Sequence, residues 1–508
     1  MNTNVHRHKK IRMNRNTKHH SPASLSDRSF RAYRIPPTRT FRSFSLLLTR
    51  HVRSYPSLFL LAFLLTASLP SCKKVLDVVS PNQVADGDVF SSVAGLRNAR
   101  IGMYSTLQNR SYYGAYYPLL VDAYTDNGTT GGYDVIDLND IAARTVSPSN
   151  LYVQNTYAAI YNSIYTANKI IANIGKVPGL ADDEKSNTLS EALFVRALGH
   201  FDLLRLFGEH WDKTSKYGIP LVTSPDSPKV AVARSTVADS YTQIIADLTT
   251  AVSGFNTYNG NQYASLSAAK ALLARVYLYY GDNTNAAAMA TDVLGDSNFG
   301  LFGPGDFTKI YTEKETKESV FELVFDQQNQ SAYNAATYAR PDALRSEVFF
   351  LAAADLNTFF QARTGDGRSD LVDFVNVDVS IQPDGRTQKY RGEATKDNSA
   401  YIIRLAEIYL IRAEASGQAT GLADLNTLRT SRGMSTLSSS DVPDDATWQQ
   451  TLADERRAEL NFEGHRLFDL ARTGKVAAVL GAGVQPIMPI PQREVAATNG
   501  IVEQNPGY

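Results

Sequence analysis

The 508-residue chain contains very little cysteine, tryptophan and histidine, and it has no long apolar run that stands out as a membrane span. The single cysteine, Cys72, cannot form an internal disulfide. Beyond residue 53 only His200, His210 and His465 remain, which argues against a zinc site built from His and Cys side chains. The apolar run "LFLLAFLL" would span only about 12 Å as a helix, whereas the bilayer core measures about 30 Å. It is therefore too short to be a good transmembrane anchor.

The N-terminal part of the chain is strongly biased in charge. Residues 1–53 carry 13 Lys and Arg but only one acidic residue, and residues 54–71 carry no charge at all. A basic stretch followed by a short apolar core and small residues is typical of a secretory signal. A nucleic-acid-binding arm is the less favoured reading, because the signal core follows directly. Translation from Met13 or a later position stays open.

Cys72 lies directly after this signal-like segment. The preceding Leu69, Pro70 and Ser71 resemble a lipobox, in which the cysteine is lipidated and becomes the first residue of the mature chain, although Pro70 is atypical there. We therefore predict a leader over residues 1–71 and lipidation of Cys72. Acyl chains would then anchor the protein, since two or more chains hold a protein stably on a membrane. An ordinary signal peptide with a coincidental cysteine is the alternative.

Removal of the leader changes the charge of the protein. The remaining 72–508 would carry 38 basic and 50 acidic residues, a net charge near −12, although the whole chain is neutral. An acidic surface argues against nucleic acid or an anionic membrane as the ligand. No Pro-, Gly- or Ser-rich linker divides this part, so we expect one large domain.

Several segments have helical periodicity. Apolar residues recur every three or four positions in 157–174, 189–208, 237–252 and 268–294. The last of these is interrupted by Gly281-Asp282-Asn283, which predicts two helices. Its small residues and Tyr277 are spaced as in a tetratricopeptide unit, although any antiparallel helix pair is the simpler reading. Residues 404–433 look like a looser second copy of this helix pair.

Two regions lack this periodicity. Residues 110–150 and 300–400 are rich in Gly, Asp and other polar residues, with one predicted strand at 319–325. Long irregular segments on a rigid scaffold are often binding loops. The fold class is thus predicted to be mainly α, with helix pairs as a scaffold, irregular loops and a few short strands.

Six segments, in their order along the chain, resemble the SusD/RagB family. Its members are surface lipoproteins of Bacteroidetes-type bacteria that bind nutrients. The segments that carry the resemblance are "EALFVRALGHFDLLRLFG" (191–208), "YGIPLV", "RSTVADSYTQIIADL", "RLAEIYLIRAEA" (404–415), "LADERRAELNFEGHRLFDLARTGK" (452–475) and the tail 488–508. The resemblance implies a single SusD-like domain over 72–508, with its helical scaffold mainly in 150–295 and 400–475. The loop-rich binding part would lie mainly in 110–150 and 300–400.

The function implied by this resemblance is the capture of oligosaccharides, or sometimes peptides. The captured ligand would be handed to a TonB-dependent SusC-like barrel in the outer membrane, with the lipoprotein anchored at Cys72 and facing the cell exterior. Neither a cofactor nor a catalytic group is expected, and whether a metal ion sits in a loop is left open.

Charged residues recur at helical spacing in 452–475, and this pattern has two interpretations. Such residues can form ion pairs along one face, each exposed pair contributing about 0.2–0.5 kcal/mol. Alternatively, Glu459 and Glu463 could act as an acid and base pair, as in a lipid-anchored glycoside hydrolase. The family resemblance implies a structural network instead. A scaffold that only binds proteins is a further alternative.

Aromatic residues provide the candidate ligand contacts. Apolar sugar faces stack on aromatic rings while amides and carboxylates bind the hydroxyls, and the tyrosine-rich segments 112–134 and 329–340 offer both. The two tryptophans, Trp211 and Trp448, flank scaffold helices and are expected to pack. The predicted ligand-binding residues are Tyr112, Tyr113, Tyr116, Tyr117, Tyr124, Asp126, Asn127, Tyr133, Tyr333 and Tyr338.

Overall fold

The computed structural model describes residues 89–130, 136–225, 231–333, 350–373, 385–390 and 397–508. All of these belong to one compact unit, Ser80–Tyr508. Cys72, Tyr133 and Tyr338 lie outside the described residues. Among the described residues helices predominate, which confirms the predicted fold class.

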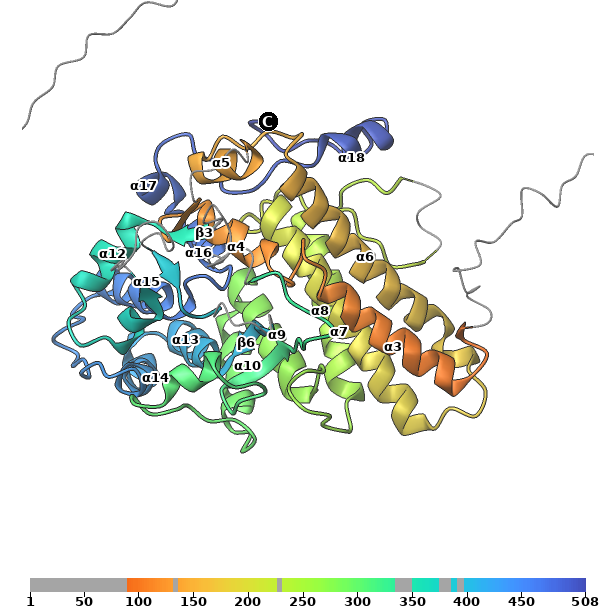
Figure 1. The fold of residues 1–508 in the computed structure, drawn as a ribbon, viewed down its shortest axis with the longest axis horizontal. Helices are drawn as coiled ribbons and strands as arrows, with labels where there is room; N and C mark the ends of the chain where they lie inside the picture. The colour runs from red at the N-terminus through yellow and green to blue at the C-terminus, as the bar shows by residue number, and fades with distance from the viewer. Residues whose placement is uncertain (1–88, 131–135, 226–230, 334–349, 374–384, 391–396) are drawn as a thin grey trace, which may run out of the picture. The chain divides into compact units, whose positions relative to one another are not determined.

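The longer helices are α3 (Val93–Leu107), α6 (Leu151–Asn173), α7 (Asp182–Phe207), α8 (Val237–Gly254), α9 (Leu266–Tyr280), α10 (Asn283–Leu294), α13 (Leu405–Ser416), α14 (Gln418–Ser431) and α15 (Asp445–Leu460). They pack in an order close to that of the chain, with α6 on α7, α7 on α8, α8 on α9, α9 on α10, α10 on α13 and α13 on α14. Figure 1 shows α3, α6, α7 and α8 side by side, and α13 to α15 grouped at the other end of this row. Neighbouring helices thus bury each other's apolar faces.

Helices α9 and α10 confirm the helix pair predicted over 268–294. The Ser265 and Asp282 side chains cap their N-termini by accepting hydrogen bonds from the backbone N–H groups of Ala268 and Asn285. Gly281 ends α9 with φ of 83°, a left-handed conformation that glycine adopts without steric cost. The predicted second copy over 404–433 also forms a helix pair, α13 and α14.

A close approach between α6 and α7 depends on a single glycine. A Cβ atom at Gly199 would lie 2.7 Å from Cγ1 of Ile164. Any larger residue would force the two helices apart, because the core at this crossing leaves no space. Ile164 and the neighbouring Ile160 are fully buried there.

Three two-stranded antiparallel sheets complete the scaffold in the described part of the chain. They pair β1 (Gly128–Thr130) with β3 (Phe350–Ala352), β2 (Ser319–Leu323) with β6 (Ala400–Arg404), and β4 (Val372–Asp373) with β5 (Arg386–Thr387). Strand β2 confirms the strand predicted at 319–325. The second pair is buried along its whole length and joins the middle of the sequence to the start of α13.

The remaining helices are short. They are α4 (Tyr116–Ala123), α5 (Ile136–Ala143), α12 (Ala354–Gln361), α16 (Arg466–Arg472), α17 (Val476–Leu480) and α18 (Gln492–Ala497), with 3-10 turns at Ile174–Lys176, Phe307–Tyr311 and Gly367–Leu371. The expectation that 110–150 is irregular is therefore wrong for α4 and α5. Pro118 stands in the first turn of α4, where its missing N–H costs nothing. Among the described helices, none combines the length and apolar character needed to cross a bilayer.

Candidate functional site

A groove of the described residues runs along the outer face of α6. Tyr157, Tyr161 and Tyr165 recur every four residues on this helix, so each ring lies about 6 Å further along the axis than the last. The rings of Tyr157 and Tyr161 are 4.8 Å apart between centroids. Tyr157 is buried against Phe207, whereas Tyr161 and Tyr165 are partly exposed. The three tyrosines thus form an aromatic floor.

One wall of this α6–α18 groove is the extended segment after α7. The hydroxyl of Tyr161 donates a hydrogen bond of 2.9 Å to the carbonyl oxygen of Pro220. The side-chain amide of Asn168 donates one of 2.8 Å to the carbonyl of Val222. These contacts fix the wall to the helix, so the groove is formed by the fold itself.

The other wall is the short helix α18. Its start is held where the backbone N–H of Gln492 donates to the carbonyl of Pro148, at 2.8 Å. Arg493 and Glu494 of α18 both line the groove. Burial raises the pKa of the Glu494 carboxyl group. No described residue donates a hydrogen bond to that carboxylate, so its acceptor sites are free for a ligand.

The size and chemistry of the groove suit an extended polar ligand. Its volume is about 770 Å³, within the range of about 300–1,000 Å³ typical of ligand sites. The side-chain amides of Gln154, Asn155 and Asn162 line it and make no hydrogen bond within the described part of the chain. Aromatic faces, free amides, a carboxylate and a guanidinium are therefore presented together.

The tyrosines predicted from the sequence as ligand contacts lie elsewhere, in the core. Tyr112, Tyr113 and Tyr117 are 5% exposed or less, and their rings pack together with centroids 4.5 to 5.5 Å apart. Their hydroxyls all donate to the carboxylate of Asp202 on α7, at 2.5, 2.7 and 3.0 Å respectively. In this structure the cluster joins α4 to α7.

The other predicted residues that the structure describes are also buried. Tyr116 packs against Tyr152 and contacts Arg110, and the hydroxyl of Tyr124 donates to the carbonyl of Gln485. The ring of Tyr333 is stacked 3.9 Å from that of Tyr390.

Asp126 and Asn127 bind the C-terminal helices. Asp126 accepts two hydrogen bonds from Arg466, both 2.8 Å, and Asn127 accepts one from Arg457. None of the described residues in the predicted set presents a free ring face or a free polar group to solvent here. That they contact ligand stays a prediction.

The charged residues of 452–475 do not pair along one exposed helix face. Glu459 accepts hydrogen bonds from Arg368, Arg404 and Arg432, at 2.7 to 3.2 Å. Glu463 accepts from Lys389 and Arg404 at 2.6 to 2.8 Å. All of these side chains are buried. The cluster ties α15 to β6 and α14, as the family resemblance implied.

This network also bears on the catalytic alternative for Glu459. Burial alone would raise the pKa of Glu459, but Arg432, Arg404 and Arg368 hold it well below its usual value. A carboxylate that stays ionised and is enclosed by three arginines cannot donate a proton as a general acid. Across the described residues, no three His, Cys, Asp or Glu side chains are grouped so that they could hold a metal ion.

The sequence alone does not reveal the groove, because Tyr157 and Tyr161 fit equally well on the apolar face of a helix. Tyrosine suits either environment, since its ring is apolar and its hydroxyl polar. The spacing of four from Tyr157 to Tyr165 was the available signal, but the sequence does not show that α18 lies beside this face.

Comparison with known proteins places the chain in a family. A model described as "Starch-binding associating with outer membrane" (SusD-like) matches residues 74–278, and the SusD family model matches residues 234–484. The chain belongs to the SusD/RagB family. Among curated members of the family, SusD-like protein P25 of Formosa agariphila is 23% identical, over 86% of this chain and 97% of its own length.

Solved structures of the family share the fold. A SusD superfamily protein from Bacteroides thetaiotaomicron is 26% identical, with a TM-score of 0.72 over 82% of this chain and all of that one. A structure described as a laminarin binding SusD-like protein is 25% identical, with a TM-score of 0.70 and the same coverage. The helical scaffold is thus that of the SusD/RagB family.

Proposed function

We propose that this protein is a cell-surface lipoprotein that binds nutrient oligosaccharides. The observation that carries the proposal is the α6–α18 groove, where a row of tyrosines faces free amides and the carboxylate of Glu494. Sugar rings have apolar faces that stack on aromatic rings, and their hydroxyls pair with amides and carboxylates. A linear oligosaccharide lying along α6 would meet the partly exposed rings of Tyr161 and Tyr165 in succession.

The family supports a glycan as the ligand. One matching family model carries a starch-binding description, and a structural relative at 25% identity is described as laminarin binding. Both ligands are glucans. The segments predicted from the sequence remain a second candidate surface, with Tyr133 and Tyr338 among their residues.

We further propose that the protein has no enzymatic activity. Glu459 and Glu463, which were the alternative acid and base, are saturated by arginine and lysine in the core. They have no free acceptor position from which to attack a glycosidic bond. Incubation with a bound glycan should leave its chain length unchanged by chromatography. Turnover that Glu459→Gln abolishes would contradict this proposal.

The direct test of ligand binding uses soluble protein covering residues 73–508. A glycan and peptide array should identify the ligand class, and calorimetry with laminarin and starch oligosaccharides should measure its affinity. We expect binding to at least one glucan. Binding to peptides alone would contradict the proposal of a glycan ligand.

The anchor and the transport partner need separate tests. We propose that Cys72 is acylated and that a TonB-dependent SusC-like barrel receives the ligand. Cells fed a clickable fatty acid should label the wild-type protein but not Cys72→Ala. Mild detergent extraction of the tagged protein should recover a large barrel near one-to-one, with crosslinks in 150–295 and 400–475. Equal labelling of Cys72→Ala would exclude the anchor, and recovery of the lipoprotein alone would exclude the partner.

A further inference from the structure

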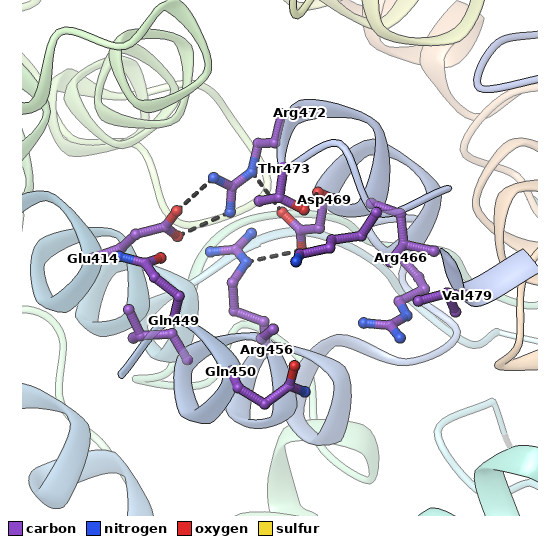
Figure 2. Close-up of a pocket in the computed structure, with 13 residues that line it drawn as sticks. Glu414, Gln449, Gln450, Arg456, Arg466, Asp469, Arg472, Thr473 and Val479 are labelled. Atoms are coloured by element: carbon purple, nitrogen blue, oxygen red, sulfur yellow. Dashed lines mark hydrogen bonds and ion pairs between the residues drawn. The ribbon is translucent and has the colours of Figure 1, made fainter. Parts of the chain in front are cut away.

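The α6–α18 groove differs in its charges from a smaller hollow between α15 and α16. In that hollow Arg472 donates to both oxygens of Glu414, at 2.5 and 2.9 Å, and through Nε to Asp469 at 2.9 Å, as Figure 2 shows. Arg456 also donates to Asp469, at 2.8 Å. The acids of the smaller hollow are therefore neutralised by arginines of the chain itself, whereas Glu494 in the groove forms no ion pair with any described residue.

The carboxylate of Glu494 lies near the tyrosine hydroxyls of α6. Burial raises the pKa of the Tyr157 hydroxyl, and the negative charge of Glu494 raises it further. Burial and the neighbouring Tyr157 raise the pKa of Tyr161, and Glu494 again adds to the increase. A charge acts on a hydroxyl in this way only when the two are close. Glu494, which is half-buried and lines the groove, is thus the acid beside Tyr157 and Tyr161.

The ring of Tyr161 presents an aromatic face next to this carboxylate. Its hydroxyl is engaged by the carbonyl of Pro220, and the ring itself is partly exposed in the groove. Tyr165, one turn further along α6, shows what such a ring can bind, since the ammonium group of Lys169 lies 5.0 Å from its centroid. Among the described residues no cation lies over the ring of Tyr161. That position combines an aromatic face and a carboxylate without a cation between them.

A half-buried carboxylate beside an aromatic face suits an ammonium group. The ring attracts the positive charge, and the ammonium donates charge-assisted hydrogen bonds to the carboxylate, which are roughly twice as strong as neutral ones. Residues 72–508 also carry more acidic than basic side chains, which favours the approach of a cation over that of an anion. The free amides of Gln154, Asn155 and Asn162 in the same groove match the hydroxyls of a sugar.

We propose that the α6–α18 groove binds an oligosaccharide that carries a free amino group, with its ammonium held between the ring of Tyr161 and the carboxylate of Glu494. This inference rests on the proposed function of the groove and narrows its ligand to amino sugars. The hydroxyls of neighbouring sugars would pair with the amides of α6. Arg493 also lines the groove, but it is exposed and forms no ion pair with Glu494, so the carboxylate keeps its charge for the ligand.

The test is calorimetry with two tetrasaccharides that differ at one group of each sugar. The glucosamine tetramer of chitosan carries an ammonium where cellotetraose carries a hydroxyl, and the linkage is the same. We expect the wild type to bind the amino sugar about tenfold more tightly, and this preference to shrink as salt increases. Glu494→Gln should bind the two equally. Glu503→Gln removes an exposed acid that pairs with Lys216 outside the groove, and this matched control should keep the preference.

Trilysine distinguishes an amino sugar from a basic peptide, because it offers ammonium groups without sugar hydroxyls. It should bind more weakly than the glucosamine tetramer, and equal or tighter binding would overturn the proposal in favour of a peptide. Equal affinity of the wild type for the two tetrasaccharides, an unchanged preference in Glu494→Gln, or no binding of either tetrasaccharide would also overturn it. Binding of laminarin or starch oligosaccharides in any of these cases would leave the proposed function intact, whereas binding of trilysine alone would contradict both.

Discussion

Two groups of tyrosines in this protein have opposite environments. Tyr112, Tyr113 and Tyr117 form a buried cluster in which every hydroxyl donates to Asp202. Tyr161 and Tyr165 lie on α6 with part of each ring open to a groove. The tyrosines of the first group lie closer together in the sequence, and this clustering alone makes them the better candidates for ligand contact when only the sequence is considered.

The difference comes from the acid that each group faces. Asp202 is fully buried and paired with Arg205 at 2.5 Å, so it gathers the tyrosine hydroxyls inward. Glu494 is only half-buried and has no partner among the described residues, so it leaves an open polar edge beside the rings. A tyrosine-rich segment therefore indicates a site only when a free polar group faces it at the surface.

The largest effect should come from removing the centre of the buried cluster. Asp202→Ala leaves the buried charge of Arg205 without its carboxylate and three hydroxyls without an acceptor, so we expect a loss of about 3–5 kcal/mol in stability. Tyr112→Phe, which removes one donor and leaves the ion pair, should cost about 1 kcal/mol. Chemical denaturation measures both. Equal losses for the two variants would contradict the central role of Asp202.

Acid should also destabilise the core around α7. Burial, assisted by Arg196, lowers the pKa of His200 to about 3. The unfolded chain binds a proton at this histidine below about pH 6.5 and the folded chain does not, so stability falls as the pH decreases through this range. His200→Gln should therefore lose about 2 kcal/mol less stability than the wild type between pH 7 and pH 5.

The control for this pH effect is Tyr161→Ala. It changes the groove and leaves His200 in place, so its stability should depend on pH as the wild type's does. Parallel pH curves for the wild type and His200→Gln would show that His200 does not titrate in this way.

For ligand affinity, substitutions in the groove should have the larger effect and substitutions in the buried cluster the smaller, which is the reverse of the order expected for stability. Tyr161→Ala removes a ring from the floor of the groove and should weaken oligosaccharide binding about tenfold, since a stacked ring contributes on the order of 1 kcal/mol or more. Tyr112→Phe should leave the affinity unchanged. Calorimetry on folded variants measures both. A loss with Tyr112→Phe and none with Tyr161→Ala would return ligand contact to the segment around α4.

The scaffold could be predicted from the sequence because its signals are local. The interruption at Gly281 and the capping residues Ser265 and Asp282 determine where α9 and α10 begin and end without help from distant residues. The same holds for α7, which ends at Phe207, where the helical periodicity predicted over 189–208 also ends. Helical periodicity in these segments reports directly which faces are buried.

The site could not be predicted in the same way because exposure depends on distant contacts. Tyr113 and Asp202 are 89 positions apart, and only the packing of α4 on the rest of the core brings them together. Similarly, the groove exists because the chain after Pro491 returns to lie along α6. The charged residues of 452–475 have helical spacing, yet their partners lie as far away as Arg368 and Arg404.

The smallest expected effect concerns Glu494, the acid that lines the groove among the described residues. Burial raises the pKa of Glu494, which means that the folded protein disfavours its charged form and loses a little stability above the carboxyl group's usual pKa. Glu494→Gln removes this cost, so at neutral pH it should be slightly more stable than the wild type, while its oligosaccharide affinity decreases because an amide is a weaker acceptor for sugar hydroxyls. Asp292→Asn, which removes an acid from an ion pair with Lys270 on α9, is the matched control. It should leave ligand affinity unchanged, and because it breaks an ion pair it should not make the protein more stable. Thermal unfolding and calorimetry on the same samples test both parts. A gain in stability with unchanged affinity would mean that Glu494 is strained for a reason other than ligand binding, and the tyrosines would then have to bind the ligand without it.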